Sequence, residues 1–421
     1  MSTSIELRNN LFIIPDTDSD NRYLVYAPLH GGAFMVDEKA KGVLSDYVSG
    51  KEIRGRIPLI DSYLDTLSKS KIHISEPAIN FKRAVIILSQ RCNLACSYCF
   101  AQNAHSNVCM TKDNLSAIID YIFKDGDDNS ISFDIIGGGE PLYEWDLCKF
   151  AISRIRSYSN SAKIGITTNA TLFNTDRINW LHKQAVKISV SFEILPDIQD
   201  SQRHYRNKSL SSFEIADKGI GLLLEKGFSI RIRSTITSLN VDRMQEMVDF
   251  VIDNYPQIKR LHFEPVSGQI EKEVLFYSTF AKEFPRIKQY ASQHGIVLKT
   301  SITNSIERSI NRFCNGEQCF TPDMNIVSCH RVSSPRDSCF SDFCIGSIND
   351  GIVKISDKAV SRIKQETVDS YPDCSSCFAK WNCAGGCLYN RKTFSTQQMK
   401  DRCIFVRQLI VNELKLKLKE V

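Results

Sequence analysis

The positions of the cysteines constrain this chain more than any other feature of its sequence. Cys92, Cys96 and Cys99 stand together in the segment RCNLACSYCF, and the segment CSSCFAKWNCAGGC holds four more between Cys374 and Cys387. The N-terminal segment MSTSIELRNN has no apolar run after a basic one, so we expect a cytoplasmic protein rather than a secreted one. Because the cytoplasm keeps thiols reduced, the 15 cysteines of the chain are expected to ligate metal rather than to form disulfides.

The first cysteine group leaves one coordination position of a metal centre open. A structural zinc site is normally closed by a fourth protein ligand, and this run contains no histidine. A four-iron cluster held by three thiolates instead keeps one iron free to bind a small molecule. Tyr98, just before the third cysteine, is positioned to pack its ring beside a bound purine. A zinc loop or spare thiols are the alternative interpretation.

The segment CNLACSYC resembles the signature of radical S-adenosylmethionine (SAM) enzymes. In that family the free iron of a 4Fe-4S cluster binds the amino and carboxylate groups of SAM. The reduced cluster breaks the sulfonium bond and gives a 5′-deoxyadenosyl radical. The resemblance implies that Cys92, Cys96 and Cys99 ligate this cluster.

Three later segments resemble other motifs of the same family. IIGGGEPL (135–142) follows a strand-like run and resembles its glycine-glycine-glutamate motif, and ITTNAT (166–171) ends another such run. SVSFEILPDIQDSQRHYR (189–206) resembles a segment that contacts the ribose and carboxylate of SAM, although this chain has Glu193-Ile194 where the family more often has aspartate-glycine. The resemblance implies a SAM site made by Tyr98, Gly138, Gly139, Glu140, Asn169, Ser191, Glu193 and Arg203.

Apolar strand-like runs alternate with helical patterns through the middle of the chain, which predicts an α/β fold with a parallel sheet. Helices are predicted over 111–124 and 241–255. The resemblance implies the partial (β/α)6 barrel of radical SAM enzymes, over residues 79–305. The six predicted strands cover residues 84–89, 131–136, 162–167, 187–192, 230–236 and 260–265.

Eight C-terminal cysteines follow an order that resembles the SPASM domain, which holds two auxiliary 4Fe-4S clusters, although CxxC pairs also occur in zinc ribbons. We assign residues 306–421 to this domain, and expect three 4Fe-4S clusters and SAM as cofactors. Met324 stands where the family often has glycine, which should affect the turn rather than the ligation. The remaining cysteines, Cys109, Cys148, Cys339 and Cys344, are expected to be free thiols. The resemblance implies that one auxiliary cluster is ligated by Cys314, Cys319, Cys329 and Cys387, and the other by Cys374, Cys377, Cys383 and Cys403.

Residues 1–78 read as a small winged-helix-like α+β module. Strands are expected near 11–15, 22–28 and 32–37, and helices over 37–50 and 58–70, with Asp37 capping the first helix and Gly50 ending it. The pattern resembles modules that bind the leader peptides of ribosomally made precursors. The alternative is a packing extension of the barrel. A DNA-binding module is disfavoured because residues 1–80 hold 9 basic and 11 acidic side chains.

These features together resemble a radical SAM/SPASM maturase that takes a hydrogen from a precursor-peptide side chain and forms a crosslink, with a carbon–carbon cyclophane favoured. An electron donor such as flavodoxin or ferredoxin is expected, but no nucleic-acid or membrane partner. The enzyme alternative is an anaerobic sulfatase-maturating enzyme, which carries an aspartate as general base directly after the third SPASM cysteine. This chain has His330 there, which we predict to be the base. A non-catalytic zinc-binding interaction protein is the alternative of another class.

Overall fold

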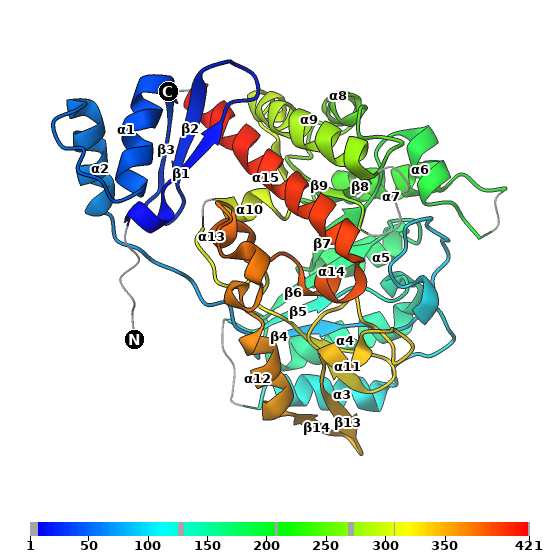
Figure 1. Ribbon diagram of the computed structural model, residues 1–421. Coiled ribbons are helices and arrows are strands. Elements are labelled where there is room, and N and C mark those ends of the chain that lie inside the picture. Colours follow the sequence, from blue (N-terminus) through cyan, green and yellow to red (C-terminus); the bar gives the residue numbers. More distant parts are fainter. Residues whose placement is uncertain (1–6, 125–129, 207–208, 268–272, 307, 420–421) are drawn as a thin grey trace.

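The computed structural model describes residues 7–124, 130–206, 209–267, 273–306 and 308–419. Its largest element is an 11-stranded sheet with the strand order β10-β9-β8-β7-β6-β5-β4-β11-β12-β13-β14. The run from β4 to β10 is parallel, and β11 joins it in parallel beside β4 (Figure 1). The parallel strands are β4 (Arg83–Ile86), β5 (Ser132–Ile135), β6 (Lys163–Thr168), β7 (Lys187–Ser191), β8 (Arg231–Ile236), β9 (Arg260–Pro265) and β10 (Val297–Lys299). The α/β fold and all six predicted strands are therefore confirmed, and β10 is a strand that the sequence analysis missed.

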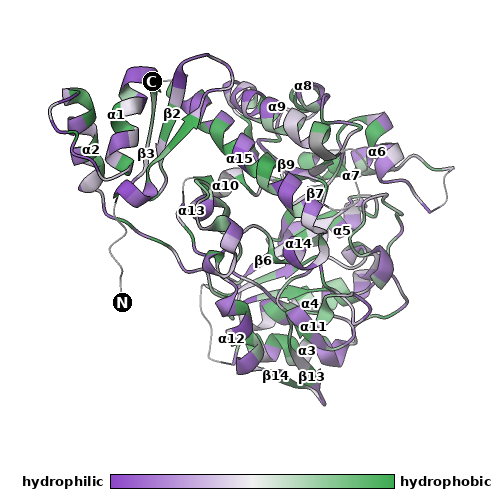
Figure 2. Cartoon of the chain, in the orientation of Figure 1, coloured by the Kyte–Doolittle hydropathy of each residue, from purple (hydrophilic) through white to green (hydrophobic). Residues whose placement is uncertain are grey.

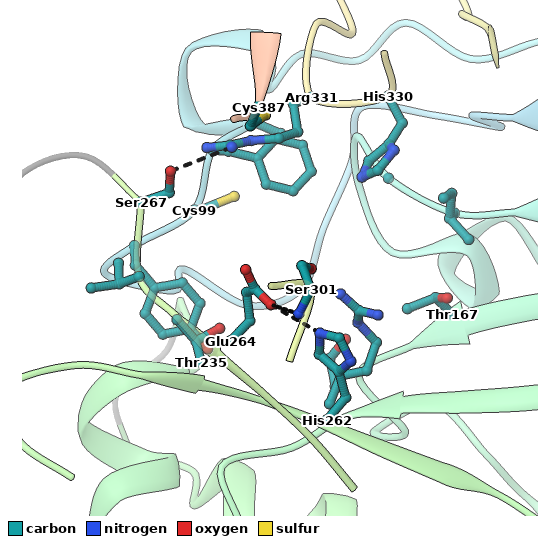
Figure 3. A pocket seen from close by; sticks show the side chains of 18 of the residues that line it. Cys99, Thr167, Thr235, His262, Glu264, Ser267, Ser301, His330, Arg331 and Cys387 are labelled. Carbon is teal, nitrogen blue, oxygen red and sulfur yellow. Dashed lines mark hydrogen bonds and ion pairs between the residues drawn. The ribbon is translucent and has the colours of Figure 1, made fainter. Parts of the chain in front are cut away.

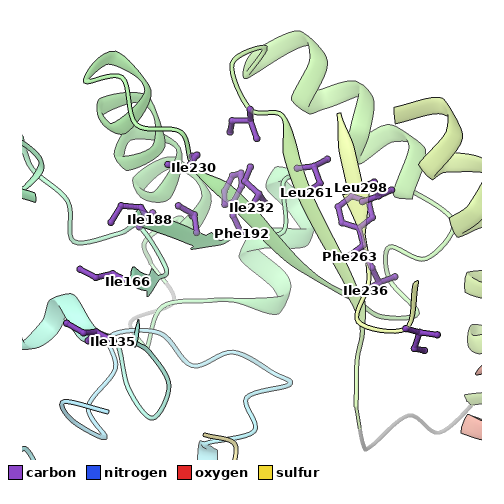
Figure 4. Close-up of a cluster of buried hydrophobic side chains, with 14 of the residues drawn as sticks. Ile135, Ile166, Ile188, Phe192, Ile230, Ile232, Ile236, Leu261, Phe263 and Leu298 are labelled. Carbon is purple, nitrogen blue, oxygen red and sulfur yellow. The ribbon is translucent and has the colours of Figure 1, made fainter. Parts of the chain in front are cut away.

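Helices between the strands cover one face of the parallel sheet. Alternate residues of each strand, such as Ile166 and Ile188, form a buried apolar layer against them (Figure 4). Each such side chain contributes about 1.5–3 kcal/mol when fully buried. The helices mix hydrophilic and hydrophobic residues along their length, as surface helices do (Figure 2). They are α3 (Lys112–Ile122), α4 (Trp145–Tyr158), α5 (Thr175–Lys183), α6 (Pro196–Gln202), α7 (Ser212–Glu225), α8 (Met244–Asn254) and α9 (Glu273–Gln293), so both helices predicted in this region are confirmed.

The C-terminal part of the chain extends the same sheet beyond β4 as an antiparallel meander. Its last helix, α15, packs along α9 and runs toward the N-terminal module (Figure 1). In the described part of the chain, no helix is both long and apolar enough to cross a bilayer. The elements here are α10 (Thr303–Ile306), β11 (Gln318–Phe320), β12 (Asn325–Val327), α11 (Phe340–Phe343), β13 (Cys344–Asn349), β14 (Ile352–Ile355), α12 (Asp357–Gln365), α13 (Lys380–Cys383), α14 (Leu388–Thr393) and α15 (Thr396–Lys419).

The N-terminal module contains the strands and helices that the sequence predicts. Its antiparallel sheet has the order β1-β2-β3. Asp37 caps the first helix by accepting a 2.8 Å hydrogen bond from the Ala40 amide, and Gly50 follows that helix with a φ of +89°. Both end signals are therefore confirmed. The elements are β1 (Phe12–Pro15), β2 (Arg22–Ala27), β3 (Gly32–Asp37), α1 (Glu38–Val48) and α2 (Pro58–Ser68).

Strand β2 belongs to two hydrophobic cores at once. Val25 and Ala27 pack inside the module, whereas Leu24 and Tyr26 point the other way and join the main core. The Tyr26 hydroxyl donates a 2.9 Å hydrogen bond to Asn382 in α13. The module is therefore packed against the C-terminal part of the chain, and its boundary at residue 78 remains a prediction.

The turn between β11 and β12 shows the effect of the residue that replaces a glycine. The Met324 amide donates to the Thr321 carbonyl at 3.0 Å, and the Thr321 amide donates to the Asn325 carbonyl at 2.9 Å. This turn requires a left-handed residue, and Met324 adopts a φ of 59°. Left-handed backbone is unfavourable for residues other than glycine. The prediction that Met324 affects the turn is consistent with this conformation.

We predict that replacing Met324 reverses the usual stability order of alanine and glycine. Met324→Gly and Met324→Ala lose the same side-chain packing, but only alanine retains the left-handed strain. The glycine variant should therefore be more stable, by about 1 kcal/mol. Urea denaturation of the two variants measures the difference. A more stable alanine variant would show that the turn carries no strain.

Candidate active site

A cavity of about 680 Å³ opens at the carboxyl ends of the parallel strands. This edge is where ligands bind in parallel α/β folds. Cys92, Cys96 and Cys99 all line the cavity. So do seven of the eight predicted SAM-binding residues, namely Tyr98, Gly138, Gly139, Glu140, Asn169, Ser191 and Arg203.

The loop with the first three cysteines is held by the segment that follows α6. The Ala95 amide donates to the His204 carbonyl at 2.8 Å, and the Ser97 amide donates to the Gln202 carbonyl at 2.9 Å. Arg206 Nε donates to the Cys92 carbonyl at 3.1 Å. Burial raises the pKa of the Cys92 thiol to about 12, with smaller contributions from Glu140 and the nearby Cys96. Two segments far apart in sequence thus fix the three sulfurs at one cavity wall.

The glycine motif is required for packing against this cysteine loop. A Cβ atom on Gly139 would lie 1.8 Å from the Arg91 carbonyl oxygen. The Gly139 amide donates to the Ser89 carbonyl at 2.9 Å, and the Glu140 amide donates to the Arg91 carbonyl at 2.8 Å. The sequence analysis expected these glycines to let backbone approach a ligand. The structure adds a second reason, which is the close approach of two loops.

The carboxylate of Glu140 lies on the inner side of this motif and is 4% exposed. It accepts hydrogen bonds from Thr168 Oγ1 at 2.6 Å and from the Asn169 amide at 2.8 Å. Burial raises the pKa of this carboxyl, and the hydrogen bonds from Thr168 and Asn169 oppose the shift. Three of the predicted SAM-binding residues, Gly139, Glu140 and Asn169, are therefore joined directly or through the backbone.

Tyr98, Glu193 and Arg203 form a buried network beside the cysteine loop. The Tyr98 hydroxyl donates to Glu193 and accepts a 2.9 Å hydrogen bond from Arg203 Nη1. The Thr235 amide occupies the second carboxylate oxygen of Glu193, at 2.7 Å. Glu193 is fully buried and does not line the cavity, so here it orients Tyr98 and Arg203. Its predicted ribose contact remains a prediction.

Arg203 keeps one donor available. Its Nε is buried and has no hydrogen-bond partner among the described residues. An unsatisfied buried donor is costly, so the site fits a further acceptor such as a carboxylate. This observation supports the predicted contact between Arg203 and the SAM carboxylate.

Ile194 adopts the backbone conformation for which the family more often uses glycine. Its φ is 70°, and its side chain is fully buried. The Leu195 amide donates across it to the Glu193 carbonyl at 2.8 Å, which closes a three-residue turn. A β-branched residue at positive φ is strained, and such strain gathers at functional sites. This turn directs Glu193 into the Tyr98–Arg203 network.

The eight C-terminal cysteines influence one another's pKa values within two groups, and the predicted cluster ligation remains a prediction. Besides burial, Cys387 and Cys314 raise the pKa of the Cys329 thiol, and Cys329 raises that of Cys319; we call these four the first thiol set. Burial raises the pKa of the Cys383 thiol to about 12, with contributions from the rest of the second thiol set, Cys403, Cys374 and Cys377. Cys383, Cys387 and Cys403 line the cavity. Over the described ranges, no three His, Cys, Asp or Glu side chains are grouped so as to hold a single metal ion.

The four cysteines left over lie outside both sets. Cys148 is fully buried in α4, and Cys339 is buried beside Val332 and Phe343. Cys109 Sγ lies 3.4 Å from Ser89 Oγ, and Cys344 Sγ lies 3.6 Å from the Gly346 carbonyl oxygen. Like the other cysteines of the described chain, these four form no disulfide, and their assignment as free thiols remains a prediction.

Comparison with known proteins agrees with this geometry. Residues 86–251 match the family model of the radical SAM superfamily. The chain carries a radical SAM domain. It is 22% identical to the radical SAM cyclopropyl synthase TigE of Paramaledivibacter caminithermalis over 454 aligned positions, which cover 92% of this chain and 91% of TigE.

Solved structures show the same fold at low sequence identity. Native anSMEcpe with bound AdoMet superposes with a TM-score of 0.62 and 16% identity, covering 79% of this chain and 99% of the other. Streptococcus suis SuiB bound to the precursor peptide SuiA has a TM-score of 0.50 and 14% identity, covering 94% and 98%. The prediction of a radical SAM enzyme is confirmed.

His330 lies at the cavity of this radical SAM enzyme, next to the first thiol set. Its Nδ1 is 2.7 Å from Glu317 Oε2, and its ring contacts the edge of Phe100. Burial alone would raise the pKa of Glu317, but His330 and Arg83 lower it to about 2. Glu317 therefore holds Nδ1 of His330, and Nε2 is the ring nitrogen left to contact another group. Figure 3 shows His330 and Arg331 across the cavity from His262 and Glu264.

The sequence analysis missed the polar floor of the cavity. Inward-facing residues of β8 and β9, among them Arg231, Arg233, His262 and Glu264, line it. The available signal was the alternation in RIRSTI and RLHFEP, where every second residue is polar. Glu264 lies 3.1 Å from His262 Nε2 and accepts a 2.9 Å hydrogen bond from the Ser301 amide.

We predict that Glu264 makes stability depend on pH in the acid range. Burial would raise its pKa, but His262 and Arg402 lower it from 4.5 to about 2. A carboxyl whose folded pKa is depressed stabilises the fold above pH 4.5, and this contribution is lost as the pH falls toward 2. The advantage of wild type over Glu264→Gln, about 3 kcal/mol at neutral pH, should shrink over this window. Urea denaturation at several pH values measures it, with the exposed Glu225→Gln as control. A constant difference would contradict the assignment.

Proposed function

We propose that this radical SAM enzyme modifies a ribosomally made precursor peptide by taking a hydrogen atom from a side chain and forming a crosslink. The supporting observation is that one cavity is lined by the first cysteine group, by seven of the eight predicted SAM-binding residues and by Cys383, Cys387 and Cys403 of the two thiol sets. The fold shared with SuiB, which is bound to the precursor peptide SuiA, supports a peptide as substrate.

The residues present fit three 4Fe-4S clusters and SAM. When bound, a reduced cluster at the first cysteine group supplies the electron that splits SAM into methionine and a 5′-deoxyadenosyl radical. Arg203 binds the SAM carboxylate through the free Nε, and Glu140 accepts from the SAM amino group. The two thiol sets would supply four thiolates each to the two auxiliary clusters. The reducing electron comes from a one-electron carrier such as flavodoxin or ferredoxin.

His330 accepts the proton that crosslinking releases. Closing a bond between a substrate radical and a second peptide group leaves one electron and one proton to be removed. Nε2 of His330 is suited to take the proton, since Nδ1 is held by Glu317. A cluster held by one of the thiol sets would, when bound, accept the electron. We favour a carbon–carbon bond, of the cyclophane type, and the cyclopropyl synthase TigE is a relative named for making carbon–carbon bonds in a ring. The histidine in place of aspartate disfavours sulfatase maturation.

We predict about twelve irons per chain after anaerobic reconstitution, because three four-iron clusters are expected. Replacing Cys92, Cys96 and Cys99 together by alanine should remove about a third of this iron and abolish SAM cleavage. The matched variant Arg203→Ala should keep the iron and weaken SAM binding about tenfold or more, since a charge-assisted contact is lost. Iron analysis and equilibrium binding of SAM measure the two effects. Bound zinc without iron–sulfur absorption would refute the proposal.

We also propose that the N-terminal module binds the leader of the precursor peptide at the edge of β3, which has no strand partner on one side among the described residues. Peptides often bind by adding a strand to such an edge. Phe34 of β3 packs on Tyr63 of α2, with ring centroids 4.0 Å apart. Leu59, one turn before Tyr63, is 79% exposed and extends this apolar strip. The alternative, a packing extension, is supported by the face of β2 that joins the main core.

We predict that Leu59→Asp weakens binding of the leader segment about tenfold or more, because it places a charge on the apolar strip. The probe is a labelled leader segment from whichever short precursor-peptide gene is found beside this one, and its binding is followed by fluorescence anisotropy. Leu239→Asp, at a side chain that is 55% exposed outside the module, is the matched control. Equal affinity of the two variants would favour the packing-extension alternative.

A further inference from the structure

The inner face of the parallel sheet carries two arginines in adjacent inward positions of β8. Strand register places Ser191 of β7, Arg233 of β8 and His262 of β9 in one row. Ser189 and Arg231 form the next row. Residues between them on β8, such as Ile232, point to the helix-covered face. Arg231 and Arg233 therefore both project from the floor into the cavity, and both line it.

The other cavity arginines already have partners. Arg83 pairs with Asp134 at 2.8 Å, and Arg203 is held by Tyr98 and Glu193. Two further arginines lie over aromatic rings: Arg331 is 4.0 Å from the Tyr389 centroid and Arg402 is 4.8 Å from the Phe405 centroid. Within the described ranges, no hydrogen bond, ion pair or aromatic contact involves the guanidinium of Arg231 or Arg233.

Their surroundings favour an added anion. Both side chains are solvent-exposed, and the surface they expose includes the cavity wall. Burial and the neighbouring Arg231 lower the pKa of Arg233, and Glu264 opposes the shift. Glu264 itself is engaged by His262, Thr300 and Ser301, and it makes no ion pair with either arginine. Two neighbouring positive charges on one cavity wall repel each other, and an anion bound between them removes this repulsion.

We infer that Arg231 and Arg233 form a carboxylate-binding subsite that holds an acidic group of the substrate at the floor of the cavity. The planar guanidinium matches a carboxylate with two parallel hydrogen bonds. Arg233 shares a row with Ser191, so this subsite lies beside the proposed SAM site. The subsite would hold one end of a substrate while a neighbouring substrate side chain faces the radical. The identification of the substrate as a peptide rests on the proposed function. The affinity of the subsite for a carboxylate is independent of that function. The acidic group is a side-chain carboxylate or a terminal one.

Three small probes test the subsite by calorimetric titration of the reconstituted enzyme, with and without SAM. N-acetylglutamate N-methylamide offers a side-chain carboxylate, N-acetylalanine offers a terminal carboxylate, and N-acetylglutamine N-methylamide is neutral. We expect at least one carboxylate probe to bind about tenfold or more tightly than the neutral one. Which of the two binds identifies the source of the carboxylate.

Two variants and one control locate the binding. Arg233→Gln and Arg231→Gln should each reduce the preference for the carboxylate about tenfold. Arg260→Gln, on β9 but outside the cavity lining, should leave it unchanged. Arg233→Lys keeps the charge without the planar fork, so it should retain part of the preference if the glutamine variant fails to fold. Iron content and SAM affinity should stay at the wild-type values throughout.

Equal binding of the neutral and carboxylate probes would overturn the inference, as would a preference that survives in both Arg231→Gln and Arg233→Gln. A loss of SAM affinity in Arg233→Gln would also overturn it, because Arg233 would then serve the SAM carboxylate. If wild type binds the carboxylate probe but not SAM, the subsite is supported and the proposed function fails. The two claims therefore fail separately.

Discussion

The alternation of apolar and polar side chains along β6, β7, β8 and β9 is the constraint on which the site depends. Strands of a parallel sheet are usually buried on both faces and read as continuous apolar runs. Here one face packs against helices through residues such as Ile166 and Phe263, and the other faces the cavity. Because side chains alternate between faces, the same four strands can supply a dry core and a charged floor.

A cavity lined by charges needs those charges to be paired, and the pairs join separate parts of the chain. Arg83 on β4 binds Asp134 on β5 and Glu317 just before β11, and Glu317 in turn holds His330. One network therefore connects the parallel sheet, its antiparallel extension and the predicted base. Because these side chains are partly buried, removing one of them leaves a neighbouring charge without its partner and destabilises the network. The orientation of His330 is thus coupled to the stability of the sheet.

Much of the fold could be predicted from sequence because its signals are local. Apolar runs placed the six strands, and Asp37 and Gly50 marked the ends of α1. The two C-terminal cysteine sets were implied by the family resemblance, and their role as cluster ligands remains a prediction. The seventh parallel strand was missed because Val297–Lys299 has three residues, too few for a pattern.

The site was less predictable, because its contacts join residues far apart in sequence. Glu193 lies behind the cavity wall, where Tyr98 and the Thr235 amide hold its two carboxylate oxygens. Sequence spacing alone could not show this, because both partners are far from Glu193 in the chain. Nor could it show that Gly139 is required by the Arg91 carbonyl. The charged floor could in principle have been predicted from the alternation of polar and apolar residues in β8 and β9, a pattern that is unusual for a parallel strand.

The two thiol sets are interleaved along the chain, since Cys387 belongs to the first set and lies between Cys383 and Cys403 of the second. Neither set is complete until this region has been synthesised. Helix α15 supplies Cys403 and also Lys415, which pairs with Asp16 of the N-terminal module. The module, although made first, cannot bury the Leu24 and Tyr26 face until the later elements arrive. Completion of both thiol sets and docking of the module therefore depend on the same late part of the chain.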